Sequence, residues 1–411
     1  MKRKNIVSII GAGAAGCFCA IELKRRRPEL DVHVYERATK PLAKVAITGG
    51  GRCNLTNSFS GFTDERGAYH DLHLLYPRGD KLMRRMLSQF SHTDTMEWFE
   101  HEGVRLVTQR DNCVFPQSQD AMEIVNTLLR LMRSEGVALH LKHELKNIEF
   151  CDEMGYKLWF NDNEKPISSD IVIITTGGGK APFLQPLGIE IVPTLPSLFT
   201  FNTANAMHNE LMGTVVENVT LSFAGTRLRS HGEILITHWG VSGPAVLKLS
   251  SYAARLLAET DYRGTLIINW CDGRNAAEVT EEISHFIEND SHRQVNNTYP
   301  SYLTNRLWLK LLEVCSIPHT QRWGALNQTH INRLVNTLTA QQVEVTGRCK
   351  YKDEFVTCGG VSLKEVNPKT LEHRNHAGLF FAGEALDIDA ITGGFNLQAA
   401  WSTAMCVARS I

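Results

Sequence analysis

The sequence predicts an α/β fold: a discontinuous, Rossmann-like nucleotide-binding domain, interrupted by an inserted β-rich domain and a small helical domain. Three observations predict it. An apolar run near the N-terminus ends in a glycine-rich turn, a strand near the C-terminus ends in another, and the segments between them change from strand-rich to helix-rich. An insertion between two halves of one nucleotide-binding domain is the simplest account of this order.

The first glycine-rich turn has the fingerprint of a dinucleotide site. Residues 6–10 predict a buried strand, Gly11-x-Gly13-x-x-Gly16 predicts the turn, and the amphipathic stretch that follows predicts a helix. Gly11 allows the tight turn, Gly13 leaves room for a pyrophosphate, and Gly16 lets the helix lie close to the strand.

Two further features complete the fingerprint. The main-chain N–H groups of Ala14 and Ala15, at the start of the helix, are expected to meet the phosphates. Glu36 closes a second strand twenty residues after Gly16 and is expected to accept hydrogen bonds from an adenosine ribose, with Arg37 beside it. These residues alone leave both NAD and FAD open.

The second glycine-rich turn favours FAD. Residues 379–382 predict a short strand that enters an acidic glycine loop, and a glycine pair then opens the last helix. In flavoproteins with two such segments, the acid reaches the ribityl hydroxyls, and the helix N-terminus points at the flavin N1–C2=O edge, where negative charge collects on reduction. The expected cofactor-binding residues here are Gly383, Glu384, Asp387, Gly393, Gly394, Asn396 and Leu397.

A third segment follows the strand that carries Glu36. Three consecutive glycines expose main-chain N–H groups and let a flat group approach the chain. We expect this segment, with a glycine run after the apolar strand 171–176, to line the cofactor through Lys44, Thr48, Gly50, Gly51, Arg52, Cys53, Asn54, Gly177 and Gly178.

Three motifs carry a family resemblance over nearly the whole chain. They are Thr48-Gly-Gly-Gly-Arg-Cys-Asn54, the stretch 233–244 that ends in Gly243-Pro244, and Thr357-Cys-Gly-Gly360. The sequence resembles the HI0933-like (YhiN/BaiN-type) family of NAD(P)/FAD-dependent oxidoreductases. The resemblance implies bound FAD and a three-part architecture. Some family members resemble reductases of conjugated enones on steroid acids, and others carry an amine-oxidase label.

The sequence departs from this family at two places. After Gly179 the family usually has a longer glycine-rich insert, which is missing here. Where the family often has Gly-Arg-Lys after the acid, this chain has Leu42-Ala43-Lys44. The first difference affects the expected substrate pocket, because that region borders the flavin in relatives.

Composition narrows the classes of partner. The 411 residues carry a formal net charge of −1, which gives no electrostatic footprint for nucleic acid. The ten cysteines form no Cys-x-x-Cys pair, and the histidines show no metal-ligand spacing, so we expect reduced cytoplasmic thiols and no metal. No apolar stretch is long enough for a membrane span. The expected protein is a monomer or homodimer that takes a small-molecule substrate.

The element pattern gives domain boundaries. We expect an FAD-binding domain in residues 1–190 and 357–411, a β-rich domain in 191–275 with closing strands near 341–356, and a helical subdomain in 276–340. Within them, hydrophobic periodicity predicts two helices in Asp80–Gly103, a hairpin in Val104–Phe115, a helix in Ala121–Gly136, a strand in Val137–Phe150, helices in Val279–Ile287, Tyr302–Cys315 and Ile331–Leu338, and strands in Val343–Phe355.

The predicted function is hydride transfer between bound flavin and a small organic substrate, such as reduction of a conjugated enone with NAD(P)H as a transient donor. His238, between a strand and a glycine turn, is a candidate proton donor or a hydrogen-bonded turn histidine. Lys44 is a candidate to stabilise the reduced flavin or an exposed lysine. The alternatives are an FAD oxidase that uses dioxygen and a flavin-containing RNA-modification or scaffold protein.

Overall fold

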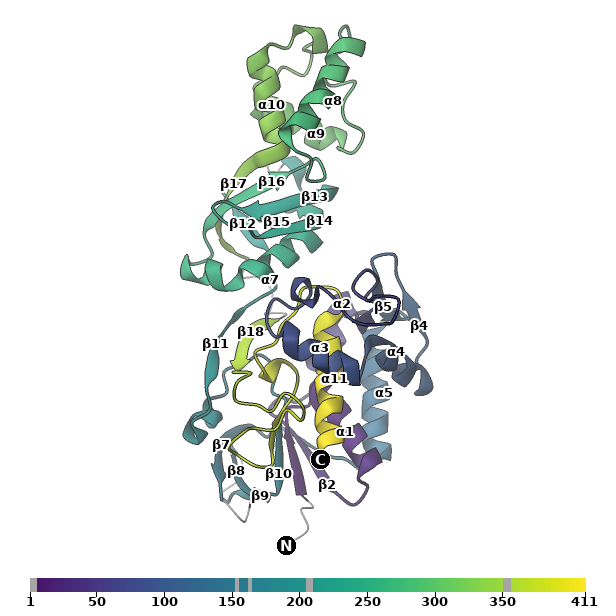
Figure 1. The fold of residues 1–411 in the computed structure, drawn as a ribbon, viewed down its shortest axis with the longest axis vertical. Coiled ribbons are helices and arrows are strands. Elements are labelled where there is room, and N and C mark those ends of the chain that lie inside the picture. Colours follow the sequence, from purple (N-terminus) through teal and green to yellow (C-terminus); the bar gives the residue numbers. More distant parts are fainter. Residues whose placement is uncertain (1–5, 152–154, 162–164, 205–209, 350–355) are drawn as a thin grey trace. The chain divides into compact units, whose positions relative to one another are not determined.

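The computed structural model describes residues 6–151, 155–161, 165–204, 210–349 and 356–411. The chain divides into two compact units (Figure 1). Unit 1 comprises Met1–Pro196 and Phe355–Ile411, and unit 2 comprises Ser197–Glu354. Both ends of the chain therefore build one unit, and the segment between them builds the other.

Unit 1 contains the parallel sheet that the fingerprint predicts. Its strand order is β19-β10-β1-β2-β6, and every neighbouring pair is parallel. The strands are β1 (Ile6–Ile10), β2 (Asp31–Glu36), β6 (Ala138–Leu141), β10 (Ile171–Ile174) and β19 (Leu379–Phe381). Since β19 comes from the end of the chain and lies beside β10, the prediction of an interrupted Rossmann-like α/β fold is confirmed.

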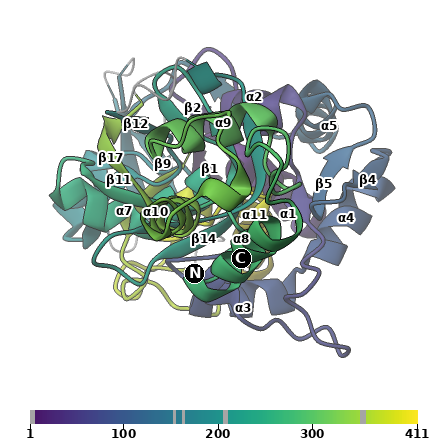
Figure 2. The same ribbon diagram turned by 90° about the horizontal axis from the view of Figure 1, so that it is seen from above.

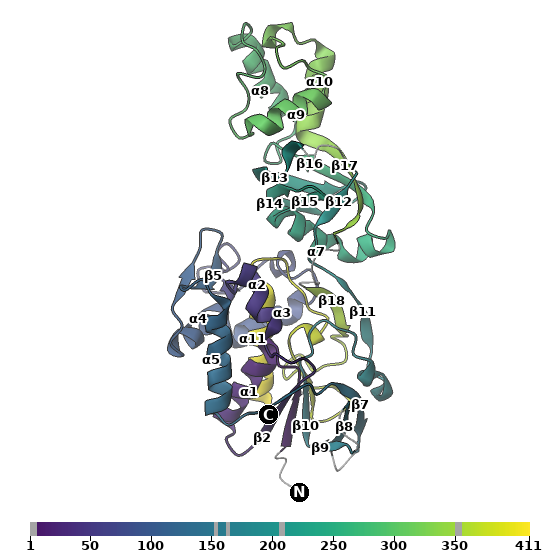
Figure 3. The same cartoon turned by 180° about the vertical axis from the view of Figure 1, so that it is seen from behind.

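Three long helices pack with this sheet. They are α1 (Ala14–Arg26), α5 (Ala121–Ser134) and α11 (Phe395–Ser410). The helix α1 contacts both α11 and α5, and Figures 1 and 3 show the first and last helices of the chain side by side. The two glycine-rich turns therefore open neighbouring helices.

The predicted single strand Val137–Phe150 is wrong. Lys142 takes a φ of +61°, and its N–H donates to the Ala38 carbonyl, so the extended run breaks there. Its first part is β6 of the parallel sheet, and its second part is β7 (Leu145–Phe150). The strand β7 instead pairs with β8 (Tyr156–Phe160), which pairs with β9 (Ile167–Ser169).

The segment between β2 and α5 forms as predicted. The two expected helices are α3 (Asp80–Gln89) and α4 (His92–His101), and the hairpin consists of β4 (Leu106–Thr108) and β5 (Cys113–Pro116). Figure 2 shows α4, α5 and this hairpin on one side of unit 1. The remaining elements here are α2 (Ala43–Gly51), β3 (Thr56–Asn57) and the short 3-10 helix η1 (Leu72–Leu74).

The strand before unit 2 in the sequence and the strand after it pair with each other in a two-stranded antiparallel sheet. It pairs β11 (Ile191–Pro196) with β18 (Thr357–Val361). We expected the inserted domain to begin at residue 191, whereas the contacts assign β11 to unit 1. The 3-10 helix η3 (Pro182–Leu187) stands where the glycine-rich insert is missing.

Unit 2 contains a closed barrel and helices. The barrel order is β12-β15-β14-β13-β16-β17. Its strands are β12 (Phe201–Thr203), β13 (Val215–Phe223), β14 (Arg229–Ile236), β15 (Gly240–Ser242), β16 (Gly264–Asn269) and β17 (Gln341–Arg348). Residues 350–355 of the predicted strand region Val343–Phe355 lie outside the described residues.

The helices of unit 2 include one that the sequence did not lead us to expect. The helix α7 (Pro244–Glu259) packs on β13, β14 and β15, in a segment predicted to be strands and turns. The helices predicted within residues 276–340 are present as α8 (Ala276–Asn289), α9 (Asn305–Val314) and α10 (Gln328–Ala340), and all three belong to unit 2. In the described part of the chain, no helix has both the length and the apolar character needed to cross a membrane.

Candidate functional site

The three fingerprint glycines have different surroundings in the turn between β1 and α1. A Cβ on Gly11 would lie 2.5 Å from the Thr175 carbonyl oxygen, and one on Gly16 would lie 2.0 Å from the Gly11 carbonyl oxygen. Around Gly13, apart from its own neighbours along the chain, no atom of the described residues lies within 4 Å of where a Cβ would stand. Protein packing therefore explains Gly11 and Gly16, whereas Gly13 leaves open space at the helix start.

The N-terminus of α1 is suited to an anion. Gly13 is its N-cap, the first turn holds no acidic residue, and no side chain of the described residues caps it. The first N–H that bonds within the helix is that of Cys17, which donates to the Gly13 carbonyl. The N–H groups of Ala14, Ala15 and Gly16 thus precede the helical ladder and add to the positive end of the helix dipole.

Glu36 is held beside this turn by main-chain donors. Its Oε2 accepts from the Ala12 N–H and its Oε1 from the Ala38 N–H, both at 2.9 Å. Each carboxylate oxygen keeps a further lone pair, which can accept from a ribose hydroxyl. The next side chain, Arg37, is exposed.

The glycine loop at the end of α2 has an unusual main chain. Gly49, Gly50, Gly51 and Cys53 take φ values of +59°, +71°, +83° and +61°. At Gly50 and Gly51, apart from neighbouring residues of α2, the described residues place no atom within 4 Å of an added Cβ. The left-handed backbone, and not crowding, therefore calls for glycine there. Thr48 has non-helical angles and begins this loop.

The side chains of this loop are mostly engaged by the protein. The Arg52 guanidinium lies 4.4 Å from the centre of the Phe115 ring and donates to Gly49 and Gln119. The Cys53 thiol is buried, which raises its pKa to about 12. In the orientation that satisfies both ends of its amide, Asn54 accepts from the Gly394 N–H.

Lys44 and Glu384 join two of the predicted segments. The Lys44 Nζ lies 3.3 Å from Glu384 Oε2, and the Gly178 N–H donates to the same oxygen at 3.4 Å. A Cβ on Gly177 would lie 3.5 Å from this oxygen. The structure thus places the Lys44 ammonium beside the acid that we expect to bind the ribityl chain.

The start of α11 is fixed by close packing. Gly394 is its N-cap at a φ of +89°, and a Cβ there would lie 2.3 Å from the Thr56 carbonyl oxygen. Gly393 accepts from the Asn57 amide. The Asn396 side chain bonds both the N–H and the carbonyl of Ala390, so its main-chain N–H is the group left for a cofactor.

The two glycine-rich turns meet each other. A Cβ on Gly383, which follows β19, would lie 3.0 Å from the Ala15 Cβ in the first turn of α1. A small recess lies beyond the carboxyl end of β10 and is lined by residues that include Thr176, Gly177, Gly360 and Ala385. This is the edge of a parallel sheet at which open α/β folds bind ligands.

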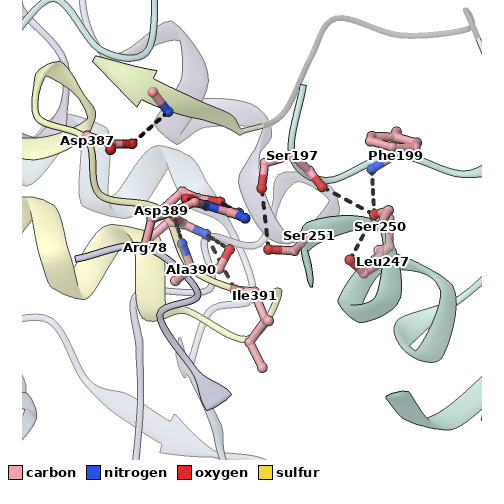
Figure 4. A network of polar contacts seen from close by, with 12 residues as sticks. Arg78, Ser197, Phe199, Leu247, Ser250, Ser251, Asp387, Asp389, Ala390 and Ile391 are labelled. Carbon is pink, nitrogen blue, oxygen red and sulfur yellow. Dashed lines mark hydrogen bonds and ion pairs between the residues drawn. The ribbon is translucent and has the colours of Figure 1, made fainter. Parts of the chain in front are cut away.

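Sequence reasoning missed one cluster in unit 1. Arg78 forms a bidentate ion pair with Asp389, and Asp387 Oδ1 accepts from the Gly359 N–H at 3.1 Å (Figure 4). Arg78 and Asp389 are 311 positions apart. The only sequence signal was the second acid of the Leu-Asp387-Ile-Asp389 run.

The candidate proton donor His238 belongs to unit 2. It lies on an exposed turn after β14, with its ring 4.4 Å from that of Trp239. Its role as an acid therefore stays a prediction. Within the described ranges, no three His, Cys, Asp or Glu side chains are grouped as metal ligands.

Comparison with known families decides the classification. The description "HI0933-like protein Rossmann domain" matches residues 5–410. The chain belongs to the HI0933-like family. Where this family often has glycine, Leu42 is buried and takes a φ of +56°.

Two relatives match almost end to end. The ribosomal RNA dihydrouridine synthase of Escherichia coli strain K12 is 30% identical, over 98% of this chain and 97% of the relative. The 3-dehydro-bile acid delta(4,6)-reductase of Clostridium scindens is 24% identical, over 99% and 98%. The first name stands against the expectation that nucleic acid is not a partner.

A solved structure shares the fold. The 3-ketosteroid delta1-dehydrogenase of Sterolibacterium denitrificans has a TM-score of 0.50 and 11% identity, and the match covers 98% of this chain and 99% of that one.

Proposed function

We propose that unit 1 binds one FAD and that the protein reduces a carbon–carbon double bond conjugated with a carbonyl group. The open space at Gly13 carries this proposal, because it is the room that a pyrophosphate needs at a helix N-terminus. Ala14, Ala15 and Gly16 would bind the phosphates, Glu36 the adenosine ribose and Glu384 the ribityl chain. FMN lacks the adenosine, so Glu36 would then have no ligand partner.

The proposed chemistry needs the cofactor, the N-terminus of α11 and an acid. Bound FAD would supply the hydride for the far carbon of the conjugated system. The N-terminal N–H groups of α11, behind Gly394, would face the edge of the flavin that becomes negative, and their dipoles would stabilise it. An acid must then protonate the carbon next to the carbonyl, and His238 is the candidate.

The substrate that we favour is a uracil base in ribosomal RNA. The C5=C6 bond of uracil is conjugated with the C4 carbonyl, so its reduction is the same step as reduction of an enone. Relatives from Escherichia coli and Haemophilus influenzae are named for this product, and both match nearly the whole chain. With a formal charge of −1, the protein has little general attraction to phosphates, so RNA binding should depend weakly on salt.

A steroid-type enone is the second candidate. The bile-acid reductase name of the Clostridium scindens relative favours it. NAD(P)H is the electron donor that we propose in both cases, docking transiently on the flavin. In the alternative of an oxidase, the organic substrate would reduce the flavin and dioxygen would accept the electrons from the reduced flavin.

One experiment separates these functions. The purified protein is analysed for FAD, reduced anaerobically with NADH or NADPH, and mixed either with ribosomal RNA lacking dihydrouridine or with a steroid 4,6-dien-3-one. Reoxidation by RNA together with dihydrouridine in the digested product supports the first substrate, and reoxidation by the dienone supports the second. Reoxidation by oxygen alone would favour an oxidase. A colourless protein that cannot be reconstituted with FAD would refute the proposal.

A further inference from the structure

A buried ion pair lies next to the proposed flavin site. Arg78 stands between η1 and α3, and its Nε and Nη2 donate to Oδ1 and Oδ2 of Asp389 (Figure 4). The Asp389 side chain is fully buried, and that of Arg78 is 12% exposed. Their main chains also form an antiparallel bridge. Two parallel charge-assisted bonds fix direction as well as distance, which a single contact cannot do.

The guanidinium stays charged in this buried position. Burial alone would lower the pKa of Arg78, but the hydrogen bonds and charge of Asp389 raise it above its ordinary value, with further contributions from Cys358 and Asp387. A buried carboxylate without such a partner would be strongly destabilised. The pair is therefore a fixed unit of the fold.

The pair holds one particular turn, residues 387–394, which leads into α11. The Ile391 N–H donates to the Leu75 carbonyl at 2.9 Å, which gives the segment around Arg78 a second contact with this turn. Asp387 is tied to β18 through the Gly359 N–H, and Asn396 bonds both main-chain groups of Ala390. Gly393 and Gly394 follow directly and open the helix.

We infer that the Arg78–Asp389 pair is a positioning device for the flavin: it fixes the turn 387–394 and thereby sets the aim of the N–H groups at the start of α11. This inference rests on the proposed binding of FAD in unit 1. Main-chain N–H dipoles stabilise the negative charge of the reduced flavin best when the fold already holds their distance and direction. Reorganising the protein during flavin reduction would cost free energy. The pair therefore raises both the affinity for FAD and the ease of flavin reduction.

The test compares variants that differ in charge and in geometry. Arg78→Lys keeps the positive charge and loses the two-point contact. Arg78→Met with Asp389→Leu removes both charges, a replacement that buried ion pairs often tolerate. Arg85→Met is the matched control, since Arg85 is an exposed arginine of α3. The readouts are the FAD dissociation constant, from fluorescence titration of the apoprotein, and the flavin midpoint potential, from anaerobic dye equilibration.

Loss of one charged hydrogen bond to the cofactor corresponds to at least about tenfold weaker binding. We expect that loss, with a more negative midpoint potential, in the double variant, a smaller loss in Arg78→Lys, and no change in Arg85→Met. Wild-type affinity and potential in both Arg78→Lys and the double variant would overturn the inference. If the wild-type protein binds no FAD, the proposed function itself fails, which is a different result.

Discussion

Gly13 offers a direct test of the cofactor site, with Gly16 as its matched control. Gly13 has a φ of −87° and open surroundings, so alanine fits the fold there and costs about 1 kcal/mol or less as a poorer helix N-cap. A Cβ on Gly16 would lie 2.0 Å from the Gly11 oxygen and 2.6 Å from Thr175 Oγ1. Such overpacking costs about 1–3 kcal/mol or more.

The two substitutions should therefore separate binding from stability. Since 1 kcal/mol shifts the melting temperature by roughly 2–4 °C in a domain of this size, Gly16→Ala should lower Tm of the apoprotein by roughly 2–12 °C or more and Gly13→Ala by at most about 4 °C. The methyl group of Gly13→Ala would displace a phosphate from at least one N–H, worth about 1.5–3 kcal/mol, or about 10–100-fold in FAD affinity. Thermal unfolding followed by circular dichroism measures Tm of the apoprotein, and fluorescence titration measures the affinity for FAD. Wild-type FAD affinity in Gly13→Ala would refute the assignment of this turn.

Three further predictions concern Glu36 and Gly394 of unit 1 and His238 of unit 2. Glu36→Ala should weaken FAD binding about 10–100-fold and leave FMN binding unchanged, because only FAD has the adenosine ribose; an equal loss for both flavins would exclude Glu36 as the ribose acid. Gly394→Val should destabilise the apoprotein by about 3 kcal/mol or more in chemical denaturation, because its Cβ would meet the Thr56 oxygen at 2.3 Å; unchanged stability would mean that the turn can move. His238→Gln should leave flavin reduction by NAD(P)H near normal and slow substrate reduction by roughly 10²–10⁴-fold in stopped-flow measurements; equal effects on both half-reactions would remove His238 from the chemistry.

The sequence predicted the parallel sheet and most helices because their signals are local. Glycine spacing, apolar periodicity and a terminal acid all lie within short windows, and β1, α1 and β2 follow them. The prediction of a single strand Val137–Phe150 was wrong because the strand breaks at Lys142, which has a left-handed backbone that lysine does not favour. The helix α7 was missed although Pro244 at its start and Ala245, Leu249 and Ala253 on one face were readable signals.

In the candidate site, too, features with a local sequence signal could be predicted and contacts between distant residues could not. The places of Glu36 and Glu384 beside the glycine-rich turns could be predicted, because each acid follows a local motif, and their roles in cofactor binding stay predictions. The partners of those groups could not be predicted, because they come from distant positions: Arg78 meets Asp389, and Lys44 meets Glu384 across 340 positions. Such pairs form only when the two ends of the chain complete one sheet, and a single sequence contains no record of that proximity.

The glycines show most clearly what structure adds to a motif. A glycine can be required by a left-handed backbone, by a neighbouring part of the protein or by a ligand. The sequence alone does not distinguish these three reasons. Among the glycines predicted to bind the cofactor, Gly50, Gly51 and Gly394 have positive φ values, and Gly16 is crowded. Of that predicted set, Gly13 alone combines an ordinary backbone with space that the described residues leave empty. Its place as the N-cap of α1 accounts for only about 1 kcal/mol or less in favour of glycine over alanine, and packing accounts for none, so the argument for a bound pyrophosphate is strongest at Gly13.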